Sequence, residues 1–576
     1  MSPTIGIDLG TTNSLIAVLG DQGPQVLRNL HGDHLTPSVV HIDADDRVLV
    51  GKAARERGHL DAGRTATQFK RSMGTSKEYM LGNKFYSSQM LSGLVLQALK
   101  RDAESLLGQS VDRAVISVPA YFNDAQRQAT KDAAELAGIE VVRMLNEPTA
   151  AALAYGLHLD AVEKCILVFD LGGGTFDVTV LEYDDGLLEV HASAGEAFLG
   201  GEDFTDALLA HVLEPVGLSP QELLEQSPLL HARLRRKVEE AKLALSDVDS
   251  VEIPMPDFTQ QEWRPRDRVH VTRAELEQLA APILERMKPV LRRALSDAAI
   301  DADEIDEVLL VGGATRMPCI SRFLEEHIGK PPRAELDPDL VVAEGAAIQA
   351  GLVTQDSAVQ DIVVTDVMPH TIGVEVVKEF GNQMRQGYFM PIIHRNTTIP
   401  TSRTDIVSTV HHNQTVMEII VYQGESRLTS KNLELGTLEV KGIPPGPKGQ
   451  ESIEVRFTYD LNGLLQIDAK ITSTGKVQSH LIEQRPGRLD PKARAAALKA
   501  MEKLKVHPRD EVENRYLLDQ GMRLFAEQSG LQRDRLGELL DLFEDALERR
   551  DDDLIPRIRD ELSILLSLLE GGDPPD

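Results

Sequence analysis

Two short segments of the chain carry an aspartate, glycines and hydroxyl side chains in the same order after an apolar run. The first holds Asp8, Gly10, Thr11, Thr12 and Asn13, and the second holds Asp170, Gly172, Gly173, Gly174 and Thr175. Glycines let backbone N–H groups approach phosphate oxygens, and threonine hydroxyls donate further hydrogen bonds. Carboxylates suit a magnesium ion that is held through its waters. Because 162 residues separate the two aspartates, we predict a duplicated half-domain with one loop from each half facing a shared cleft.

A third glycine turn follows another apolar run. Gly312, Gly313 and Arg316 come directly after Leu310-Val311, and this turn could hold the base and ribose of a nucleotide. One such turn is compatible with an ordinary strand-turn-helix, but three of them favour a phosphate-binding function. The chain has neither a Walker loop nor a dinucleotide-binding fingerprint. The pattern resembles the actin-like ATPase superfamily instead.

Hydrophobic periodicity divides the chain into segments of different structure. Short apolar runs alternate with helical patterns up to about residue 355, which predicts an α/β domain. Period-two alternation follows: Ile453–Tyr459 and Leu465–Ile471 flank a turn containing Asn462-Gly463, which predicts an antiparallel hairpin in a β-sandwich-like domain. Amphipathic stretches after Pro486-Gly487 predict a small helical bundle.

We therefore predict a multidomain protein whose domains differ in fold class. The predicted domains are an actin-like, two-lobed α/β ATPase domain over residues 1–358, an apolar linker over 359–366, a β-sandwich over 367–484, and a short helical lid with its tail over 485–576. Apolar linker residues are unlike the polar residues of linkers that merely separate domains. We expect this linker to dock on a neighbouring surface.

Composition excludes several classes of partner. The chain has 576 residues and a formal net charge of −30, which repels nucleic-acid phosphate and anionic lipid. No segment approaches the roughly 20 apolar residues of a membrane span, and the N-terminus lacks a basic, apolar leader. The only cysteines, Cys165 and Cys319, are too sparse for a disulfide framework or a zinc site. We expect a cytoplasmic monomer that binds neither nucleic acid nor membrane.

Longer motifs narrow the resemblance to one family. The motifs are Ile7–Ser14, Val118–Asp124, Asn146–Gly156, Phe169–Asp177, Leu199–Phe204, and Asn413-Gln414 followed by Tyr422–Glu425. Together they resemble heat-shock protein 70 (DnaK-type) chaperones over residues 5 to about 480. The resemblance implies an ATP-dependent chaperone that binds and releases short apolar segments of unfolded polypeptides.

The resemblance also assigns roles in ATP hydrolysis. It implies that Thr11, Thr12 and the Gly172–Thr175 loop hold the β- and γ-phosphates, and that Lys70 stabilises charge on the γ-phosphoryl group. It implies that the acidic residues place the attacking water and the metal waters. The implied catalytic residues are Asp8, Lys70, Glu147, Asp170, Thr175 and Asp177, with Mg²⁺ held through waters by Asp8 and Asp170. Potassium ions beside the phosphates are a further expectation from the family.

The remaining nucleotide contacts match the family position by position. These are Gly200, Gly201, Glu239, Lys242, Ser246, Gly313, Arg316 and Asp339. The spacing of Glu239, Lys242 and Ser246 predicts that they share one helix face. Leu243 stands where some family members have an arginine that stacks on adenine, so we expect somewhat weaker nucleotide binding.

Coupling and substrate residues follow from the same resemblance. Pro119, Arg127 and linker residues Asp361, Ile362, Val363 and Val364 match the positions that connect the ATPase to the peptide clamp, and Arg143 and Asn146 match positions that meet a J-domain co-chaperone. Met417 matches the central peptide pocket, and Val377 and Val410 match the arch over the peptide backbone. Plain core packing is the alternative for each of these three residues.

Departures from housekeeping members point to a specialised bacterial branch, the HscC type. The segment between Lys70 and Pro119 is short, which leaves the nucleotide exchange factor unidentified, and the helical C-terminus is short. A shorter lid predicts faster peptide release.

Three alternatives remain open at this stage: a sugar or acetate kinase on the same fold, a nucleotide-binding peptide scaffold with little or no turnover, and a filament-forming protein. The β-domain and the linker argue against the first and third of these, and the full set of catalytic residues argues against the second.

Overall fold

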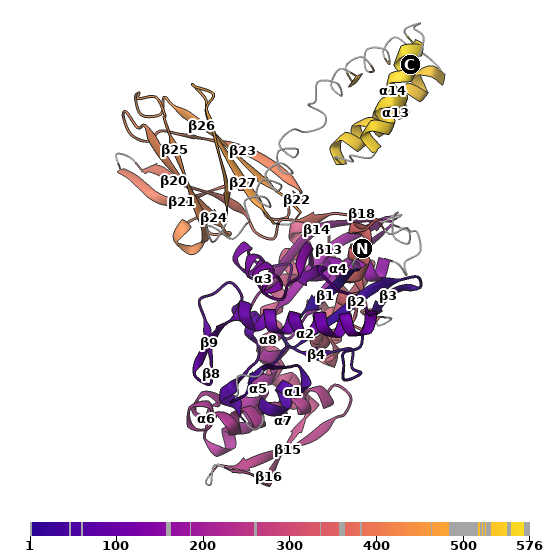
Figure 1. The fold of residues 1–576 in the computed structure, drawn as a ribbon, viewed down its shortest axis with the longest axis vertical. Helices are drawn as coiled ribbons and strands as arrows, with labels where there is room; N and C mark the ends of the chain where they lie inside the picture. Colours follow the sequence, from indigo (N-terminus) through magenta and orange to yellow (C-terminus); the bar gives the residue numbers. More distant parts are fainter. Residues whose placement is uncertain are drawn as a thin grey trace. The chain divides into compact units, whose positions relative to one another are not determined.

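The computed structural model describes most of the chain and divides it into two compact units. It describes residues 3–44, 48–58, 61–156, 163–184, 186–258, 262–333, 336–355, 363–380, 383–461, 463–482, 517–518, 521, 525, 531–549 and 554–569. The first unit comprises Met1–Ile399, Thr415–Ile443 and Leu461–Gly463; the second comprises Pro400–Gln414, Pro444–Asp460 and Leu464–Asp576. Figure 1 shows the order of the elements along the chain.

The first lobe of the first unit is built on a six-stranded sheet with the order β11-β10-β1-β2-β3, to which β4 adds beside β2. Strand β1 pairs in parallel with β10 and antiparallel with β2. Its strands are β1 (Thr4–Leu9), β2 (Asn13–Gly20), β3 (Gly23–Val26), β4 (Thr36–Pro37), β10 (Arg113–Val118) and β11 (Glu140–Asn146). Helices α2 (Ser88–Leu107) and α3 (Asp124–Leu136) pack with this sheet into one apolar core.

A second sheet repeats the same pattern in the second lobe. Its order is β17-β12-β13-β14-β18, with β12 parallel to β17 and antiparallel to β13. The strands are β12 (Lys164–Leu171), β13 (Phe176–Asp184), β14 (Leu187–Glu196), β17 (Glu307–Val311) and β18 (Val363–Val364). Helices α8 (Arg273–Ala298) and α9 (Pro318–Ile328) complete its core. The repeated strand-turn-strand confirms the duplication predicted from the two glycine loops.

Helices α4 (Glu147–Gly156) and α10 (Val341–Val353) join the cores of the two lobes. They share one apolar cluster with residues from β10, β11, β12 and β17. Small residues permit this packing: a Cβ at Gly345 of α10 would lie 1.7 Å from the carbonyl oxygen of Ala150 in α4. The close approach fixes the distance between the lobes, and therefore between the loops at their strand ends.

Smaller elements surround the two sheets. They are β5 (Val40–Ile42), β6 (Val48–Val50), β7 (Thr65–Ala66), β8 (Glu78–Leu81), β9 (Lys84–Ser87), α1 (Lys52–Gly58), α5 (Gly201–Leu213), α6 (Pro220–Gln226), α7 (Pro228–Ala244), β15 (Ser250–Asp257) and β16 (Glu262–Thr272). The short 3₁₀ helices are η1 (Ala62–Arg64), η2 (Phe69–Ser72), η3 (Glu214–Val216), η4 (Ala302–Glu304) and η5 (Gly313–Arg316). Helices α5 and α7 and strands β15 and β16 contribute to one apolar cluster.

The first unit also contains a four-stranded antiparallel sheet of order β21-β20-β24-β25. Its strands are β20 (Ile372–Phe380), β21 (Gln383–Ile393), β24 (Val416–Gln423) and β25 (Leu433–Lys441), with η6 (Thr429–Lys431) before β25. Two short strands, β19 (Asp366–Val367) and β22 (Thr398–Ile399), pair with each other. Alternating burial along β24 places Met417, Ile419 and Val421 on one inward face, as predicted from their spacing.

In the described part of the second unit, the sheet β23-β26-β27-β28 is followed by helices α13 and α14. The strands are β23 (Thr401–Ser408), β26 (Ser452–Tyr459), β27 (Leu465–Ile471) and β28 (Val477–Ile482). Val455 lies opposite Ala469 and Phe457 opposite Ile467, which confirms the predicted hairpin and its inward face. Helices α13 (Leu531–Arg549) and α14 (Leu554–Leu569) pack against each other through Leu536, Phe543, Ile558, Leu562 and Leu566.

The described residues therefore fit the predicted multidomain fold class, with an α/β part, antiparallel sheets suited to a β-sandwich, and C-terminal helices. The predicted boundaries at 358/359 and 484/485 and the predicted helix around Leu498–Leu504 lie outside the described residues. Within the described part of the chain, no helix is both long and apolar enough to cross a bilayer.

Candidate functional site: a cleft lined by three glycine loops

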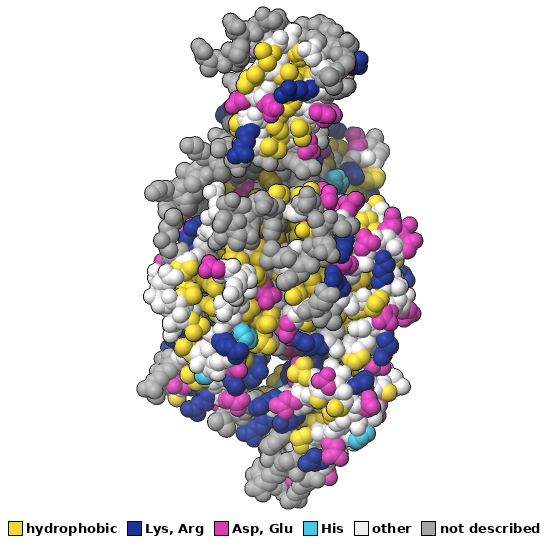
Figure 2. Space-filling view, turned by 90° about the vertical axis from the view of Figure 1, so that its right-hand side faces the viewer, with side chains coloured by type: hydrophobic (Ala, Val, Ile, Leu, Met, Phe, Trp, Pro, Cys, Tyr) yellow, Lys and Arg dark blue, Asp and Glu magenta, His cyan; other side chains and the backbone are white. Residues whose placement is uncertain are grey.

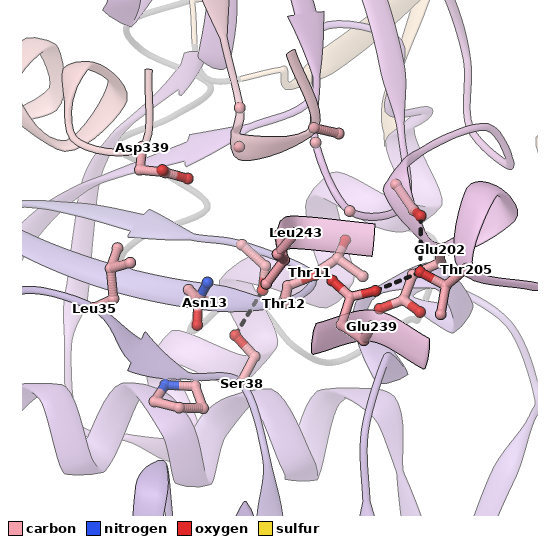
Figure 3. A pocket seen from close by; sticks show the side chains of 18 of the residues that line it. Thr11, Thr12, Asn13, Leu35, Ser38, Glu202, Thr205, Glu239, Leu243 and Asp339 are labelled. Atoms are coloured by element: carbon pink, nitrogen blue, oxygen red, sulfur yellow. Dashed lines mark hydrogen bonds between the residues drawn. The ribbon is translucent and has the colours of Figure 1, made fainter. Parts of the chain in front are cut away.

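The three glycine loops of the sequence line one large cleft in the first unit, with a volume of about 2340 Å³ (Figure 3). The predicted site residues that line it are Asp8, Gly10, Thr11, Thr12, Asn13, Lys70, Glu147, Asp170, Gly172, Gly173, Thr175, Gly201, Glu239, Lys242, Ser246, Gly312, Gly313, Arg316 and Asp339. Drug-sized ligands fill pockets of roughly 300–1,000 Å³. The cleft is therefore large enough for a nucleotide together with its ions and water.

Close backbone packing explains why the loops need glycine. A Cβ at Gly10 would lie 2.0 Å from the carbonyl oxygen of Asn13, and one at Gly173 would lie 2.1 Å from the hydroxyl of Thr12. The second contact joins the loops of the two halves. Gly200 packs against the backbone of Gly173, since a Cβ at Gly200 would lie 2.6 Å from the Gly173 carbonyl carbon. Side chains at these positions would push the loops apart.

Lys70 and Glu147 form a buried ion pair in the cleft. The Nζ atom of Lys70 donates a 2.8 Å hydrogen bond to Oε1 of Glu147, and the two residues are 5% and 8% exposed. The ammonium also lies 5.6 Å from the centre of the Phe122 ring. Element η2 supplies the lysine and the first turn of α4 supplies the glutamate. This places one positive charge in the cleft, close enough to act on Asp8 and Asp170.

Buried carboxylates outnumber this single lysine. Burial and the nearby Glu147 raise the pKa of Asp8 to about 7 and that of Asp177 to about 8. Burial, followed by repulsion from Glu147, Asp177 and Asp8, raises the pKa of Asp170 well above its ordinary value. Such a group is stabilised by a cation. Among the described residues, Oδ2 of Asp170 is buried without a hydrogen-bond partner.

This donor set fits a magnesium ion that is held through waters and phosphate oxygens. Carboxylate oxygens are the ligands that Mg²⁺ prefers, and the ion usually keeps several of its waters. Across the described residues, no group of three or more acidic, histidine or cysteine side chains could hold a metal directly. Asp8 and Asp170 are the residues that would hold its waters, and the ion would neutralise charge on transferring phosphate oxygens.

A second polar cluster lies on α7 at another part of the cleft (Figure 3). The ammonium of Lys242 donates to the carbonyl oxygen of Gly201 at 2.9 Å and to the hydroxyl of Thr205 at 3.0 Å, and it pairs with Glu239 at 2.9 Å. Thr205 in turn donates to Glu239. Ser246 lies beyond Ala244, the last residue of α7. The prediction that these residues share one helix face is therefore wrong for Ser246, because the helix ends first, although Ser246 still lines the cleft.

The third glycine turn is fixed by Asp339. Gly312 adopts a φ of +82°, and a Cβ at Gly313 would lie 2.6 Å from Oδ1 of Asp339. Arg316 donates to Oδ2 of Asp339 at 3.1 and 2.9 Å. Leu243 lines the same cleft and is 56% exposed. The turn thus presents a restrained guanidinium and an apolar side chain that a base and ribose could contact.

Arg71, Ser117 and Ser38, which the sequence did not single out, support these loops together with Asp203. Arg71 donates to the carbonyl oxygen of Gly174 at 3.3 Å and to Asp203 at 2.6 Å, and Asp203 accepts from the amide of Gly200 at 2.9 Å. Ser117 donates to Oδ1 of Asp8 at 2.8 Å. Ser38 donates to the carbonyl oxygen of Gly10 at 2.8 Å. No sequence signal marks an arginine or a serine as such a support, because each depends on a partner that is distant in sequence.

A buried polar chain joins α3 and β11 to β19, at the start of the β-rich segment (residues 366–482). Arg127 donates to Oδ1 of Asn146 at 2.6 Å, and the Asn146 amide donates to both oxygens of Asp366 at 2.8 Å. Pro119 is buried at the start of the turn that carries the Arg127 acceptors Ala120 and Phe122. The predicted positions Arg127 and Asn146 are therefore in direct contact, and Asn146 extends the chain to Asp366, a residue that the sequence did not single out.

The linker adds a strand to the second lobe. Val363 pairs with Leu187 and Val364 with Leu188, so that β18 extends the sheet at β14. The amides of Val363 and Thr365 donate to the carbonyl oxygens of Gly186 and Leu188 at 2.9 Å. This confirms that the apolar segment docks on a neighbouring surface. Asp361 and Ile362 lie outside the described residues.

The predicted peptide-binding residues fall in different strands and units. Val377 lies half-buried in β20, and Met417 lies buried in β24 of the same sheet. Val410 is half-buried in the second unit. Arg143, predicted to meet a J-domain, lies in β11 with its side chain partly buried, and burial lowers the pKa of its guanidinium.

Comparison with protein families supports one assignment. The family model described as Hsp70 protein matches residues 4–81 and 77–538, which is nearly the whole chain. The chain belongs to the Hsp70 family. Hsp70 proteins are ATP-dependent chaperones that use nucleotide and Mg²⁺, bind unfolded polypeptides and co-chaperones, and act in protein folding and the stress response. The finer assignment to the HscC type stays a prediction.

The surface of this Hsp70 protein carries charges of both signs. On the face drawn in Figure 2, acidic and basic side chains are interspersed among apolar ones. Charge of either sign is therefore distributed over this face rather than gathered in one block.

Proposed function

We propose that this Hsp70 protein hydrolyses ATP in the cleft and uses the reaction to open and close a peptide clamp in its β-rich segment. The observation that carries the proposal is the Lys70–Glu147 pair at the point where the glycine loops of both lobes meet. Hydrolysis of a phosphoanhydride is mainly a matter of positioning and charge stabilisation. A buried ammonium fixed by one carboxylate suits that task.

We assign the individual residues their roles from the family resemblance and from the cleft that most of them line. The backbone amides and hydroxyls of the Thr11–Thr12 and Gly172–Thr175 loops bind the β- and γ-phosphates. Lys70 stabilises negative charge on the γ-phosphoryl oxygens, and Glu147 and Asp177 orient the attacking water. Bound magnesium, whose waters Asp8 and Asp170 would hold, supplies charge neutralisation.

Nucleotide specificity is assigned to the other end of the cleft. We assign the ribose and base to Glu239, Lys242, Ser246, Gly313, Arg316 and Asp339, with Gly200, Gly201 and Gly312 as backbone supports. Leu243 offers the base an apolar contact in place of a stacked cation. Potassium beside the phosphates is part of the proposal, supported by the excess of buried carboxylates.

Coupling is assigned to the contacts that join the lobes to the β-rich segment. A switch requires two states that its ligands distinguish. The strand pairing of Val363 and Val364 with β14 and the Arg127–Asn146–Asp366 chain are contacts that one state would make and the other would lose. We also assign Pro119, Asp361 and Ile362 to this coupling between the ATPase and the peptide clamp.

Substrate and co-chaperone contacts complete the proposal. Met417 forms the central apolar pocket for one side chain of an extended peptide, and Val377 and Val410 arch over its backbone. Arg143 and Asn146 meet a J-domain. Because Asn146 is buried against Asp366, that contact requires the polar chain to open first. The proposed domains are residues 1–358, 359–366, 367–484 and 485–576, in a cytoplasmic monomer.

Single-turnover ATP hydrolysis with and without an apolar heptapeptide tests the proposal. Hydrolysis that the peptide accelerates is the expected result. Hydrolysis that no peptide or J-domain alters would contradict the coupling and leave only an ATPase. A chain that binds ATP and peptide without turnover would instead be the scaffold, which the intact set of catalytic side chains disfavours.

A further inference from the structure

One short segment of the first lobe has neighbours on two sides. Residues Pro119–Phe122 follow strand β10. On one side, the Phe122 ring lies under Lys70. The backbone amides of Tyr121 and Ala120 favour the charged form of Asp177 and so oppose the rise of its pKa. A Cβ placed on Gly195 would touch both Oδ1 of Asp177 and Cβ of Tyr121. Displacement of this segment would therefore change the surroundings of Lys70 and Asp177.

His370 contacts the other side of the same segment. Its Nε2 atom lies 3.0 Å from the carbonyl oxygen of Tyr121, and its ring packs edge-on against the Tyr121 ring with a centroid distance of 4.2 Å. His370 precedes β20 and lies four residues after Asp366, which binds Asn146. A carbonyl oxygen only accepts, so Nε2 must carry the hydrogen. Such an imidazole can be neutral and still make both contacts.

Two arginines disfavour a proton on this imidazole. They are Arg127 from α3 and Arg293 from α8, and Arg293 lies 5.8 Å from the centre of the Tyr121 ring. Glu425, after β24, is the acidic group on that side, and it already accepts hydrogen bonds from Thr371 and Arg395. Arg395 is in turn held by Asp297 of α8 at 2.7 and 2.9 Å. A proton on His370 would thus add a third cation to a site whose carboxylates are already paired.

We propose that His370 is a positioning residue that holds the Pro119–Phe122 segment against the β-rich segment only while its imidazole is neutral, so that docking between these parts responds to pH. One consequence of the proposal rests on the proposed function: hydrolysis and peptide release would depend on pH. The contacts of His370 themselves do not depend on that function.

The direction of the response follows from proton linkage. Burial, the largest effect, lowers the pKa of docked His370 from 6.5 to about 4. The hydrogen bond to Tyr121 and the charge of Glu425 oppose this lowering, and Arg127 and Arg293 add to it. The undocked side chain takes a proton near its ordinary pKa. Docking is therefore fully favoured above pH 6.5 and weakens as the pH falls toward 4, by about tenfold between pH 7.5 and 5.5. Asp366 opposes this trend, since burial raises its pKa.

Amide hydrogen exchange of the full-length chain with ATP and Mg²⁺ tests the proposal. The readout is the exchange rate at Val363 and Thr365, whose amides donate to the carbonyl oxygens of Gly186 and Leu188 in this structure and would be released on undocking. The rates of wild type and His370→Gln are compared at each pH, which cancels intrinsic exchange chemistry and the contribution of Asp366. Glutamine keeps a donor but does not titrate. We expect wild type to exchange about tenfold faster than the variant at pH 5.5 and at a similar rate at pH 7.5.

A constant ratio across this range would overturn the proposal. His31→Gln, a change at an exposed histidine, should retain the wild-type response and serves as the matched control. Direct NMR titration of His370 in the wild type needs no variant. A pKa of His370 below 5 supports the proposal, and a pKa near 6.5 overturns it. Neither measurement uses hydrolysis as its readout. Failure of this proposal is therefore distinguishable from failure of the proposed function, which would appear as absent ATP turnover.

Discussion

The Nζ atom of Lys70 lies 2.8 Å from Oε1 of Glu147, although 77 residues separate them in the chain. Both side chains are buried, and burying either charge alone would be costly. The pair therefore holds a cation in the water-poor end of the cleft without requiring a bound ligand to balance it. A fixed, desolvated charge of this kind acts more strongly on a transferring phosphoryl group than one in water.

Replacing Lys70 by alanine should lower the single-turnover rate of ATP hydrolysis by about 10²- to 10³-fold, because charge on the γ-phosphoryl group would lose its fixed partner. Nucleotide affinity should change much less, since the glycine loops remain. Quench-flow measurement of γ-phosphate release gives the rate. The control is Lys77→Ala, which removes a lysine on the exposed loop before β8. A Lys70→Ala rate within threefold of wild type would contradict the catalytic assignment.

Replacing Asp366 by alanine should uncouple the peptide clamp, because it removes both hydrogen bonds to the Asn146 amide. Allosteric couplings are typically worth about 5- to 150-fold, so we expect the peptide-dependent acceleration of hydrolysis to fall toward unity. The ratio of turnover with and without a saturating heptapeptide measures this. Asp21→Ala, at an exposed turn, is the control. Full stimulation in Asp366→Ala would show that the polar chain does not carry coupling.

Replacing Leu243 by arginine should tighten ATP binding by about 2- to 30-fold, because a guanidinium can stack on a base where an exposed leucine now lies. Calorimetric titration with ATP and Mg²⁺ gives the affinity. Leu224 is also exposed in the cleft lining, on α6, so Leu224→Arg controls for added positive charge. Equal effects of the two substitutions would mean that charge alone, and not stacking at position 243, sets the affinity.

Replacing Met417 by alanine separates a peptide pocket from plain core packing. Met417 and Ile419 share the inward face of β24, and either truncation should cost about 2–5 kcal/mol of stability. Only the pocket assignment predicts that Met417→Ala weakens heptapeptide binding by about tenfold or more while Ile419→Ala leaves it nearly unchanged. Fluorescence anisotropy of a labelled peptide, together with urea unfolding, checks both quantities. Equal loss of peptide affinity in the two variants would favour core packing.

Local patterns in the sequence sufficed for much of the fold. Period two predicted the pairing of Ile453–Tyr459 with Leu465–Ile471, because a strand face depends only on alternate residues. The repeated aspartate-glycine-hydroxyl order predicted two equivalent strand-turn-strands. Helical spacing was a weaker guide, since it placed Ser246 on a helix that ends at Ala244. A helix end depends on its capping contacts, which spacing does not contain.

The sequence by itself determined the chemistry of the site. Glycine, threonine, aspartate and lysine in those orders suit phosphate and magnesium wherever the chain places them, since each property belongs to the residue type and its immediate neighbours.

Only the tertiary structure decided which of these groups meet. Arg71 reaches Gly174, Ser117 reaches Asp8, Asn146 reaches Asp366 and His370 reaches Tyr121 across long stretches of chain. The Arg71 contact depends on how close α4 and α10 bring the two lobes. The Ser117 contact depends on the pairing of β1 with β10, and the last two contacts depend on where β19 and β20 begin. A hydrogen bond requires its atoms to lie within about 3 Å, and no local pattern specifies that distance for residues so far apart in the chain.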